Sequence, residues 1–375
     1  MKKRVLIIED DKLLGTIYLK KFSMAGISVE IARAGKDGLR QVAAYRPHAM
    51  LLDLMLPDMS GIEVLQSLRS DAATRELPVL VFTNAFLPGT IQQARDAGAT
   101  EVITKADCPI TQLVERFAAV LAQTSYHPPA GEIAPAAPVA APEVDLRKML
   151  REQAGPLESA LVRFSMIPSD SSRLIAVSQA THAVAGNAAA AGEHTLAWMA
   201  AALEALEQDL LEKPRQRNPS STNTIMNATR LLLAWLKGET PIPQRRPADC
   251  TILSVDDDPI IGQVVVTALA RAQLRSIPVQ DPVMALEILQ KDKFGLVLLD
   301  VEMPEMDGPT LCAELRKSSM NRDTPVVFVT AVGEFERRTA SLASGGDDLL
   351  AKPFLPMELA VKALTWLLKS GTATK

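Results

Sequence analysis

Two stretches of the chain, residues 1–122 and 250–370, alternate short apolar runs with amphipathic segments. In the first stretch the runs are Val5–Ile8, Val29–Ala32, Met50–Asp53, Val79–Thr83 and Val102–Thr104, and helix-like segments fall near 12–25, 36–45, 61–70, 89–97 and 109–121. The second stretch repeats the runs at 251–255, 276–279, 296–300, 325–330 and 348–351. Continuous apolar runs are typical of strands buried on both faces. Alternating strands and helices predict a parallel sheet covered by helices on both sides, once in each stretch.

The chain between these stretches is helical in character. Residues 143–237 are rich in Ala, Leu, Glu, Gln and Met, and we expect a four-helix bundle with helices starting near 144, 170, 193 and 221. Residues 123–142 are rich in Ala and Pro, which predicts an extended linker without a core of its own. The predicted order is an α/β domain at 1–122, a linker at 123–142, a helical bundle at 143–237, a linker at 238–249 and an α/β domain at 250–375.

Polar residues recur in register across the two α/β stretches. Asp53 and Asp300 each end an apolar run, and they are 247 positions apart. The same separation of 247 relates Glu9 to Asp256, Asp10 to Asp257, Thr83 to Thr330, Gly98 to Gly345 and Lys105 to Lys352. Polar landmarks that keep one spacing through two copies predict a duplicated domain.

These landmarks predict a site at one edge of each sheet, because the carboxyl ends of parallel strands lie together. Carboxylates such as Glu9, Asp10 and Asp53 form a hard oxygen site that suits Mg²⁺. With the metal bound, Asp53 could act as a nucleophile toward phosphorus. The Thr83 hydroxyl and the Lys105 ammonium could then hold the phosphoryl oxygens. In the second copy these roles fall to Asp256, Asp257, Asp300, Thr330 and Lys352.

In the spacing of acid pair, aspartate, threonine and lysine, both copies resemble receiver domains of two-component response regulators. The resemblance implies a five-stranded flavodoxin-like fold, Mg²⁺, and phosphorylation of Asp53 and Asp300. It also implies metal contacts from the backbone carbonyls of Met55 and Glu302. Receiver domains that phosphorylate and dephosphorylate their own aspartate need no separate catalytic domain, and the sequence shows none.

The two copies depart from the family pattern to different degrees. The family's aromatic residue three positions before the lysine is Val102 in one copy and Leu349 in the other. The first copy also has Asn84 after its threonine and Ala106 after its lysine, where the second has a small residue and a proline. We therefore expect Asp300 to be the fully competent acceptor and Asp53 to react more slowly.

The second predicted helix of the middle domain carries a candidate phosphoryl carrier, His182. The apolar face of this helix consists of Leu174, Val177, Thr181, Val184 and Ala188. His182 lies about 120° from that face, so we expect it to point toward solvent. Small neighbours such as Gly186 would let another domain approach closely, and a neutral imidazole is nucleophilic near pH 7.

The segment from His182 through Ala185-Gly186 to Gly192 resembles a histidine phosphotransfer domain. In that family a lysine stands where this chain has Ala185, so a local positive charge is missing. The resemblance implies that His182 exchanges phosphoryl groups with an aspartate. The plainer alternative is a helical spacer that carries one exposed histidine.

The sequence thus favours a phosphorelay protein whose partners are a sensor histidine kinase, a downstream response regulator, or both. The alternative is a scaffold in which the receivers are phosphorylated, His182 is inert, and the bundle binds partners or forms a homodimer. An aspartate-nucleophile hydrolase is disfavoured, because such enzymes carry a second acid two residues after the nucleophile, and of the two residues at that place, Met55 and Glu302, only one is acidic.

The amino-acid composition indicates which kinds of partner and which cellular compartment to expect. A formal net charge of -4 and the lack of a basic helix-turn-helix predict no nucleic-acid partner. No apolar run is long enough to insert into a membrane. The 3 cysteines form no CxxC or Cys/His grouping, so neither a zinc site nor a disulfide framework is expected, and a reducing cytoplasm fits best.

Overall fold

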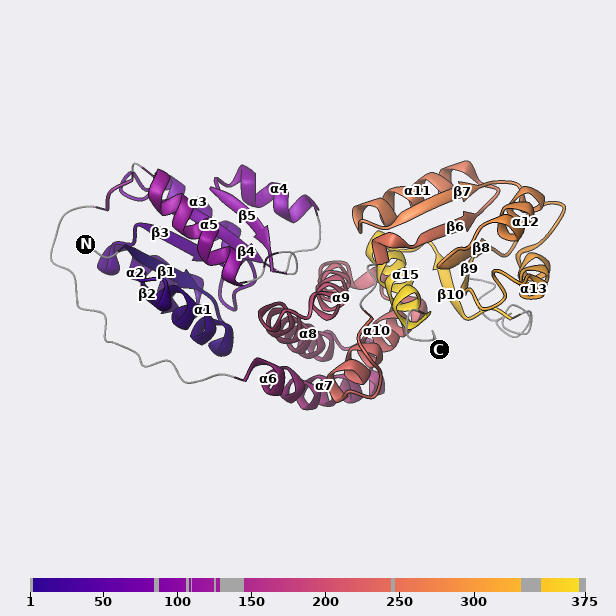
Figure 1. Ribbon diagram of the computed structural model, residues 1–375, viewed down its shortest axis with the longest axis horizontal. Coiled ribbons are helices and arrows are strands. Elements are labelled where there is room, and N and C mark those ends of the chain that lie inside the picture. The colour runs from indigo at the N-terminus through magenta and orange to yellow at the C-terminus, as the bar shows by residue number, and fades with distance from the viewer. Residues whose placement is uncertain are drawn as a thin grey trace. The chain divides into compact units, whose positions relative to one another are not determined.

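Figure 1 shows a computed structural model of the chain, which describes residues 3–83, 88–105, 108, 110–124, 126–128, 145–243, 247–331 and 345–370. Asn84, Ala106 and most of the predicted linker 123–142 lie outside the described residues. By its internal contacts the chain forms two compact units, Met1–Gln153 with His182–Ala201, and Ala154–Thr181 with Ala202–Lys375. Each unit contains one of the predicted α/β domains.

The first unit contains a five-stranded parallel sheet in the order β2-β1-β3-β4-β5. Its strands are β1 (Arg4–Ile8), β2 (Ser28–Ala32), β3 (Ala49–Leu52), β4 (Val79–Thr83) and β5 (Glu101–Thr104). Its helices are α1 (Lys12–Met24), α2 (Gly35–Tyr45), α3 (Gly61–Ser70), α4 (Pro88–Asp96) and α5 (Ile110–Gln123). Separate apolar clusters pack α1 and α5 on one face, and α2, α3 and α4 on the other. Both faces of the sheet are therefore buried, as the continuous apolar runs predict.

The second unit repeats this sheet, with the order β10-β9-β8-β6-β7. Its strands are β6 (Thr251–Val255), β7 (Arg275–Val279), β8 (Leu296–Asp300), β9 (Val326–Ala331) and β10 (Asp348–Lys352). Its described helices are α11 (Pro259–Arg271), α12 (Pro282–Lys291), α13 (Gly308–Lys317) and α15 (Pro356–Ser370). Read from the opposite edge, the order matches that of the first sheet. The predicted fold class, two receiver-like α/β domains and a helical middle region, is confirmed.

The duplication extends to an arginine outside the predicted landmarks that contacts the landmark glycine in each domain. The guanidinium of Arg69 donates to the carbonyl oxygen of Gly98 at 2.9 and 2.7 Å, and that of Arg316 donates to Gly345 at 2.9 and 2.6 Å. Gly98 and Gly345 have φ values of 93° and 97°, a conformation that strongly favours glycine. The shared backbone requirement explains why both glycines stand 247 positions apart.

The helical middle region comprises α6 (Leu146–Glu152), α7 (Ala154–Met166), α8 (Ser171–Ala191), α9 (His194–Glu212) and α10 (Pro219–Lys237). The first predicted helix is thus two helices that meet at Gln153. At the start of α8, Asp170 accepts a hydrogen bond from the Ser172 amide at 2.8 Å and caps the helix. The predicted apolar face of α8 is buried throughout. Across the described ranges, no helix combines the length and hydrophobicity that crossing a membrane requires.

Replacing Gly98 by alanine should destabilise the first α/β domain. The positive φ is unfavourable for alanine, and the added methyl group would lie 2.8 Å from Arg69 Nε. We expect a loss of about 1–3 kcal/mol, visible in urea unfolding and in faster amide exchange of β5 in the full chain. The control is Gly89→Ala in α4, where nothing lies within 4 Å of the new methyl group and stability should hold or rise slightly. Equal effects of the two changes would contradict this explanation.

Candidate functional site

The sheet of the first unit brings the predicted polar residues together at its carboxyl edge. Glu9 and Asp10 follow β1, Asp53 follows β3, Thr83 ends β4, and Lys105 follows β5. Strand β1 pairs directly with β3, with Ile8 opposite Leu52, so the acids after these strands become neighbours. Apart from Asp10, these side chains belong to buried residues that are at most 2% exposed. The arrangement is a buried charged pocket and not a set of solvated loop acids.

The Lys105 ammonium connects two of the carboxyl groups. Its Nζ lies 2.9 Å from Glu9 Oε2 and also donates a short hydrogen bond to Asp53 Oδ2. Burial raises the pKa of Glu9 to about 8, an effect that Lys105 opposes and Asp53 reinforces. Burial also lowers the pKa of Lys105, but the charges of Asp53 and Glu9 outweigh it, so this pKa is well above its usual value. The lysine therefore stays charged and offsets part of the negative charge of the pocket.

The remaining oxygens of the pocket fit a hard divalent cation. Ligand atoms of Glu9, Asp10 and Asp53 lie within 4.8 Å of one another. Glu9 Oε1 and Asp10 Oδ1 are buried atoms with no hydrogen-bond partner in the part of the chain that the structure describes. Burying such oxygens without a donor is unfavourable, and Mg²⁺ binds through carboxylate oxygens. The donor set therefore matches the Mg²⁺ that the sequence predicts.

Backbone groups near the end of β3 also hold Asp53 in position. The amide of Met55 donates to Asp53 Oδ1 at 3.1 Å and orients the carboxylate. A Cβ atom at Gly61 would lie 2.4 Å from the carbonyl oxygen of Asp53, so α3 can begin against the strand end only with glycine there. The equivalent Gly308 would place its Cβ 2.2 Å from the carbonyl of Asp300. Metal contacts from the carbonyls of Met55 and Glu302 stay a prediction.

The second α/β domain brings its equivalent residues together in a more open pocket. Ligand atoms of Asp256, Asp257 and Asp300 lie within 4.8 Å of one another. Lys352 Nζ lies 2.8 Å from Asp256 Oδ2 and 3.0 Å from Asp300 Oδ1. The Lys352 side chain is 21% exposed, against 1% for Lys105, and Asp257 is exposed. Thr330 is buried at its predicted place in β9.

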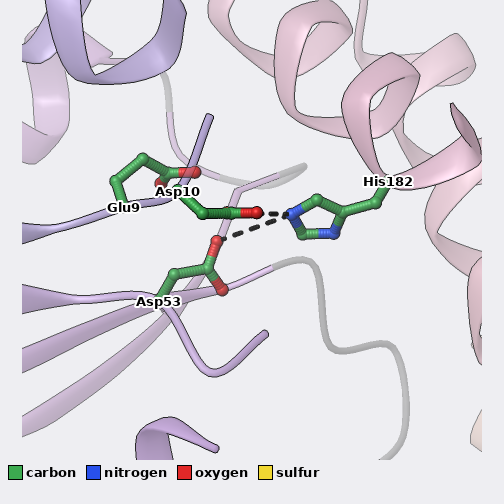
Figure 2. Close-up of side chains that lie close together, drawn as sticks. All are labelled: Glu9, Asp10, Asp53 and His182. Atoms are coloured by element: carbon green, nitrogen blue, oxygen red, sulfur yellow. Dashed lines mark ion pairs between the residues drawn. The ribbon is translucent and has the colours of Figure 1, made fainter. Parts of the chain in front are cut away.

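His182 lies at the pocket of the first receiver, as Figure 2 shows. Its Nε2 is 3.9 Å from Asp53 Oδ2 and 4.0 Å from Asp10 Oδ1. The side chain is only 13% exposed, so the prediction that it points toward solvent is wrong. The helical period shows only which side of α8 the histidine lies on. It cannot show that a surface of the first α/β domain covers that side.

Small residues on α8 allow this close approach. A Cβ atom at Gly186 would lie 2.5 Å from Leu14 Cδ1 of α1, so a larger residue would push the two helices apart. Asn187 Nδ2 donates a long hydrogen bond of 3.4 Å to Asp11 Oδ2, and Ala190 packs against the apolar cluster around α1. The small residues around His182 are the sequence signal for this contact. Nothing in the sequence pattern identifies Leu14 or Asp11 as the partners.

Comparison with known proteins agrees with the fold of the two α/β domains. The response regulator receiver domain matches the chain twice, over residues 5–118 and 252–364. These matches cover more than half of the chain, which therefore belongs to the response regulator receiver domain family. Membership of the family implies signalling by aspartyl phosphorylation.

Individual relatives match about one third of the chain. A protein described as "Probable transcriptional regulator ycf27" of Cyanophora paradoxa is 37% identical over 123 residues, which are 33% of this chain and 50% of the relative. Response regulator MprA of Mycolicibacterium vanbaalenii is 34% identical over 134 residues, 36% of this chain and 57% of the relative. The chain thus spans about half the length of the curated relatives it matches.

Among solved structures, the receiver domain of sensor histidine kinase PA1611 from Pseudomonas aeruginosa PAO1 was crystallised with a magnesium ion in its active site cleft. It is 29% identical, with a TM-score of 0.30, and the match covers 32% of this chain and 97% of that domain.

Replacing Lys105 by methionine should destabilise the first receiver strongly, because Glu9 and Asp53 would lose their buried counter-ion. We expect a loss of about 3–5 kcal/mol in urea unfolding of the full chain without divalent cations. Lys352→Met should cost less, since that lysine is partly exposed. Added Mg²⁺ should restore part of the stability of the Lys105→Met chain. Equal losses for both variants, with no effect of Mg²⁺, would contradict the assigned charge balance.

Proposed function

We propose that this chain is a phosphorelay protein in which Asp53 and Asp300 accept phosphoryl groups with the help of Mg²⁺, and His182 exchanges a phosphoryl group with Asp53. The observation that carries the proposal is the 3.9 Å separation of His182 Nε2 and Asp53 Oδ2. In-line transfer of a phosphoryl group requires donor and acceptor atoms that face each other across phosphorus. The short separation of the imidazole nitrogen and the aspartate oxygen supports such an arrangement.

Transfer from Asp53 to His182 follows from the side chains present. The lone pair of Nε2 attacks the phosphorus of the aspartyl phosphate, which requires the ring proton to sit on Nδ1. The N–P bond forms as the bond from phosphorus to the Asp53 oxygen breaks, and the electron pair returns to the Asp53 carboxylate. The reverse reaction uses the same atoms, so the geometry supports transfer in either direction.

The other polar residues of the pocket hold the group that is transferred. The Lys105 ammonium, already beside Asp53 Oδ2, can pair with a phosphoryl oxygen, and the Thr83 hydroxyl can donate to another. A magnesium ion held by Glu9, Asp10 and Asp53 would supply positive charge against the phosphoryl oxygens. Burial of the pocket limits the access of water, which would protect the acyl phosphate from hydrolysis.

The second receiver fits the role of a separate entry or exit point. Asp300 is 9% exposed and Lys352 lies partly open to solvent, so a partner could reach this pocket more easily. A sensor histidine kinase, a downstream response regulator, or both would be the partners for this chemistry. The proposed domains are receivers at 1–122 and 250–375, with the phosphotransfer bundle at 143–237 between the two linkers.

Within this proposal, burial explains why position 185 is an alanine and not a lysine. The related family has a lysine at this position, whereas Ala185 is 0% exposed. A lysine at a fully buried position would carry an unpaired charge into the protein interior, which is unfavourable. The positive charge near the phosphoryl group is instead available from Lys105 of the receiver.

A phosphotransfer experiment in the full chain tests the proposal. In the Asp300→Asn variant, label from acetyl phosphate can enter the receivers only at Asp53. We expect part of this label to become alkali-stable and acid-labile, which is typical of phosphohistidine, and to disappear when His182→Gln is added. The matched control is His194→Gln, an exposed histidine on α9, which should keep the alkali-stable label. Label confined to alkali-labile aspartyl phosphate would favour the scaffold alternative.

The docking of α8 should set the rate of transfer. Gly186→Leu would force α8 away from Leu14, and a displacement near 1 Å can slow a positioned reaction by about 100-fold. Labelling of Asp53 by acetyl phosphate should be unchanged, since this step does not use α8. Gly155→Leu in α7, where nothing lies within 4 Å of an added Cβ, is the control. Transfer at the normal rate in the Gly186→Leu chain would mean that the contact is not used.

A further inference from the structure

The donor atoms at the first receiver form a mixed set of nitrogen and oxygen ligands. His182 contributes an imidazole nitrogen to the carboxyl groups of Glu9, Asp10 and Asp53, and all the ligand atoms lie within 4.8 Å of one another. Figure 2 shows the imidazole pointing toward Asp10 and Asp53. Imidazole moves the preference of a site from Mg²⁺ toward ions such as Zn²⁺, because Mg²⁺ favours oxygen ligands alone.

The distances suit an ion between these groups. His182 Nε2 lies 3.9 Å from Asp53 Oδ2 and 4.0 Å from Asp10 Oδ1. An ion midway between His182 Nε2 and either one of these oxygens would be about 2 Å from both atoms, which is close to the length of a Zn–N or Zn–O bond, and the two carboxylates would have to move closer to the imidazole to bind the same ion. A small movement of the side chains would therefore complete the coordination.

A second observation points to a missing ligand. Glu9 is 2% exposed, and its Oε1 has no hydrogen-bond partner among the residues described by the structure. Its other oxygen, Oε2, pairs with Lys105. Two of the three carboxyl groups, those of Glu9 and Asp53, thus share one ammonium, and a divalent cation would both balance the remaining negative charge and bind the unpaired oxygen.

The second receiver serves as an internal comparison. Its equivalent set, Asp256, Asp257 and Asp300, contains carboxylates without an imidazole. The two pockets share their acid positions, so the nitrogen ligand is the difference that should change metal preference. His182 can contribute to the first pocket because the segment His182–Ala201, which includes the C-terminal part of α8, belongs to the same compact unit as that receiver.

We propose that the docked His182 and the acids of the first receiver form a Zn²⁺-class metal site that holds the docked state. His182 Nε2 has one lone pair in the plane of the ring, and a metal bond to it excludes attack on phosphorus. Bound zinc would therefore inhibit phosphoryl transfer between Asp53 and His182. The proposal depends on the docked position of His182 and does not require that phosphoryl transfer occurs.

Zinc titration of the full chain, freed of metals with a chelator, tests the site. Calorimetry should find one Zn²⁺ site whose affinity falls at least about tenfold in His182→Ala. His194→Ala and Asp257→Asn should leave this affinity unchanged, because neither residue belongs to the first pocket. Gly186→Leu should weaken zinc binding while keeping the histidine, since the site exists only in the docked state. Unchanged zinc affinity in both His182→Ala and Gly186→Leu would overturn the proposal.

Spectroscopy provides a readout that does not depend on affinity. Mn²⁺ bound to the chain should show coupling to an imidazole nitrogen in electron spin echo measurements, and His182→Ala should remove it. The absence of nitrogen coupling in the unmodified chain would overturn the assignment of His182 as a ligand.

The zinc proposal and the relay can fail separately. Transfer from Asp53 to His182 is measured in Mg²⁺ with zinc chelated, so normal transfer without a zinc site would leave the relay intact. A zinc site without any transfer would support a metal-held scaffold instead.

Discussion

The structure of the first receiver depends on one buried ammonium that balances two buried carboxyl groups. Lys105 meets Glu9 and Asp53 only when β1, β3 and β5 occupy one sheet, because each residue follows a different strand. A buried charge without a partner costs several kcal/mol, so the pocket and the sheet stabilise each other. Among the residues that the structure describes, the same geometry leaves Glu9 Oε1 without a hydrogen-bond donor, and this oxygen suits a bound cation.

The two receivers share one fold, but their pockets differ in exposure to solvent. Both have the same strand order, and in both a lysine spans carboxylates at the carboxyl edge of the sheet. In the first, Lys105 is enclosed and His182 lies over Asp53, whereas in the second Lys352 is partly exposed. The first pocket is therefore suited to exchange with a histidine held nearby, and the second to a partner that arrives from solution.

The reactivity proposed for His182 depends on the surface of the first receiver that it contacts. A histidine on a helix is nucleophilic only when its nitrogen is unprotonated and faces an acceptor. Gly186 and the other small residues bring α8 close enough to place Nε2 beside Asp53, and the nearby acids also make that nitrogen a candidate metal ligand. If both proposals hold, phosphoryl transfer and zinc binding would compete for the same lone pair, and the metal supply would then control the transfer.

The sequence by itself determined the duplicated α/β fold, because continuous apolar runs and a repeat of 247 positions are local and periodic signals. It also identified the acids, threonines and lysines, since the ends of parallel strands converge by topology alone. Only the tertiary structure decided that His182 is covered and lies at the first receiver. That contact joins surfaces far apart in the chain, through shape and small side chains such as Gly186, and no periodicity within one helix specifies which surface it meets.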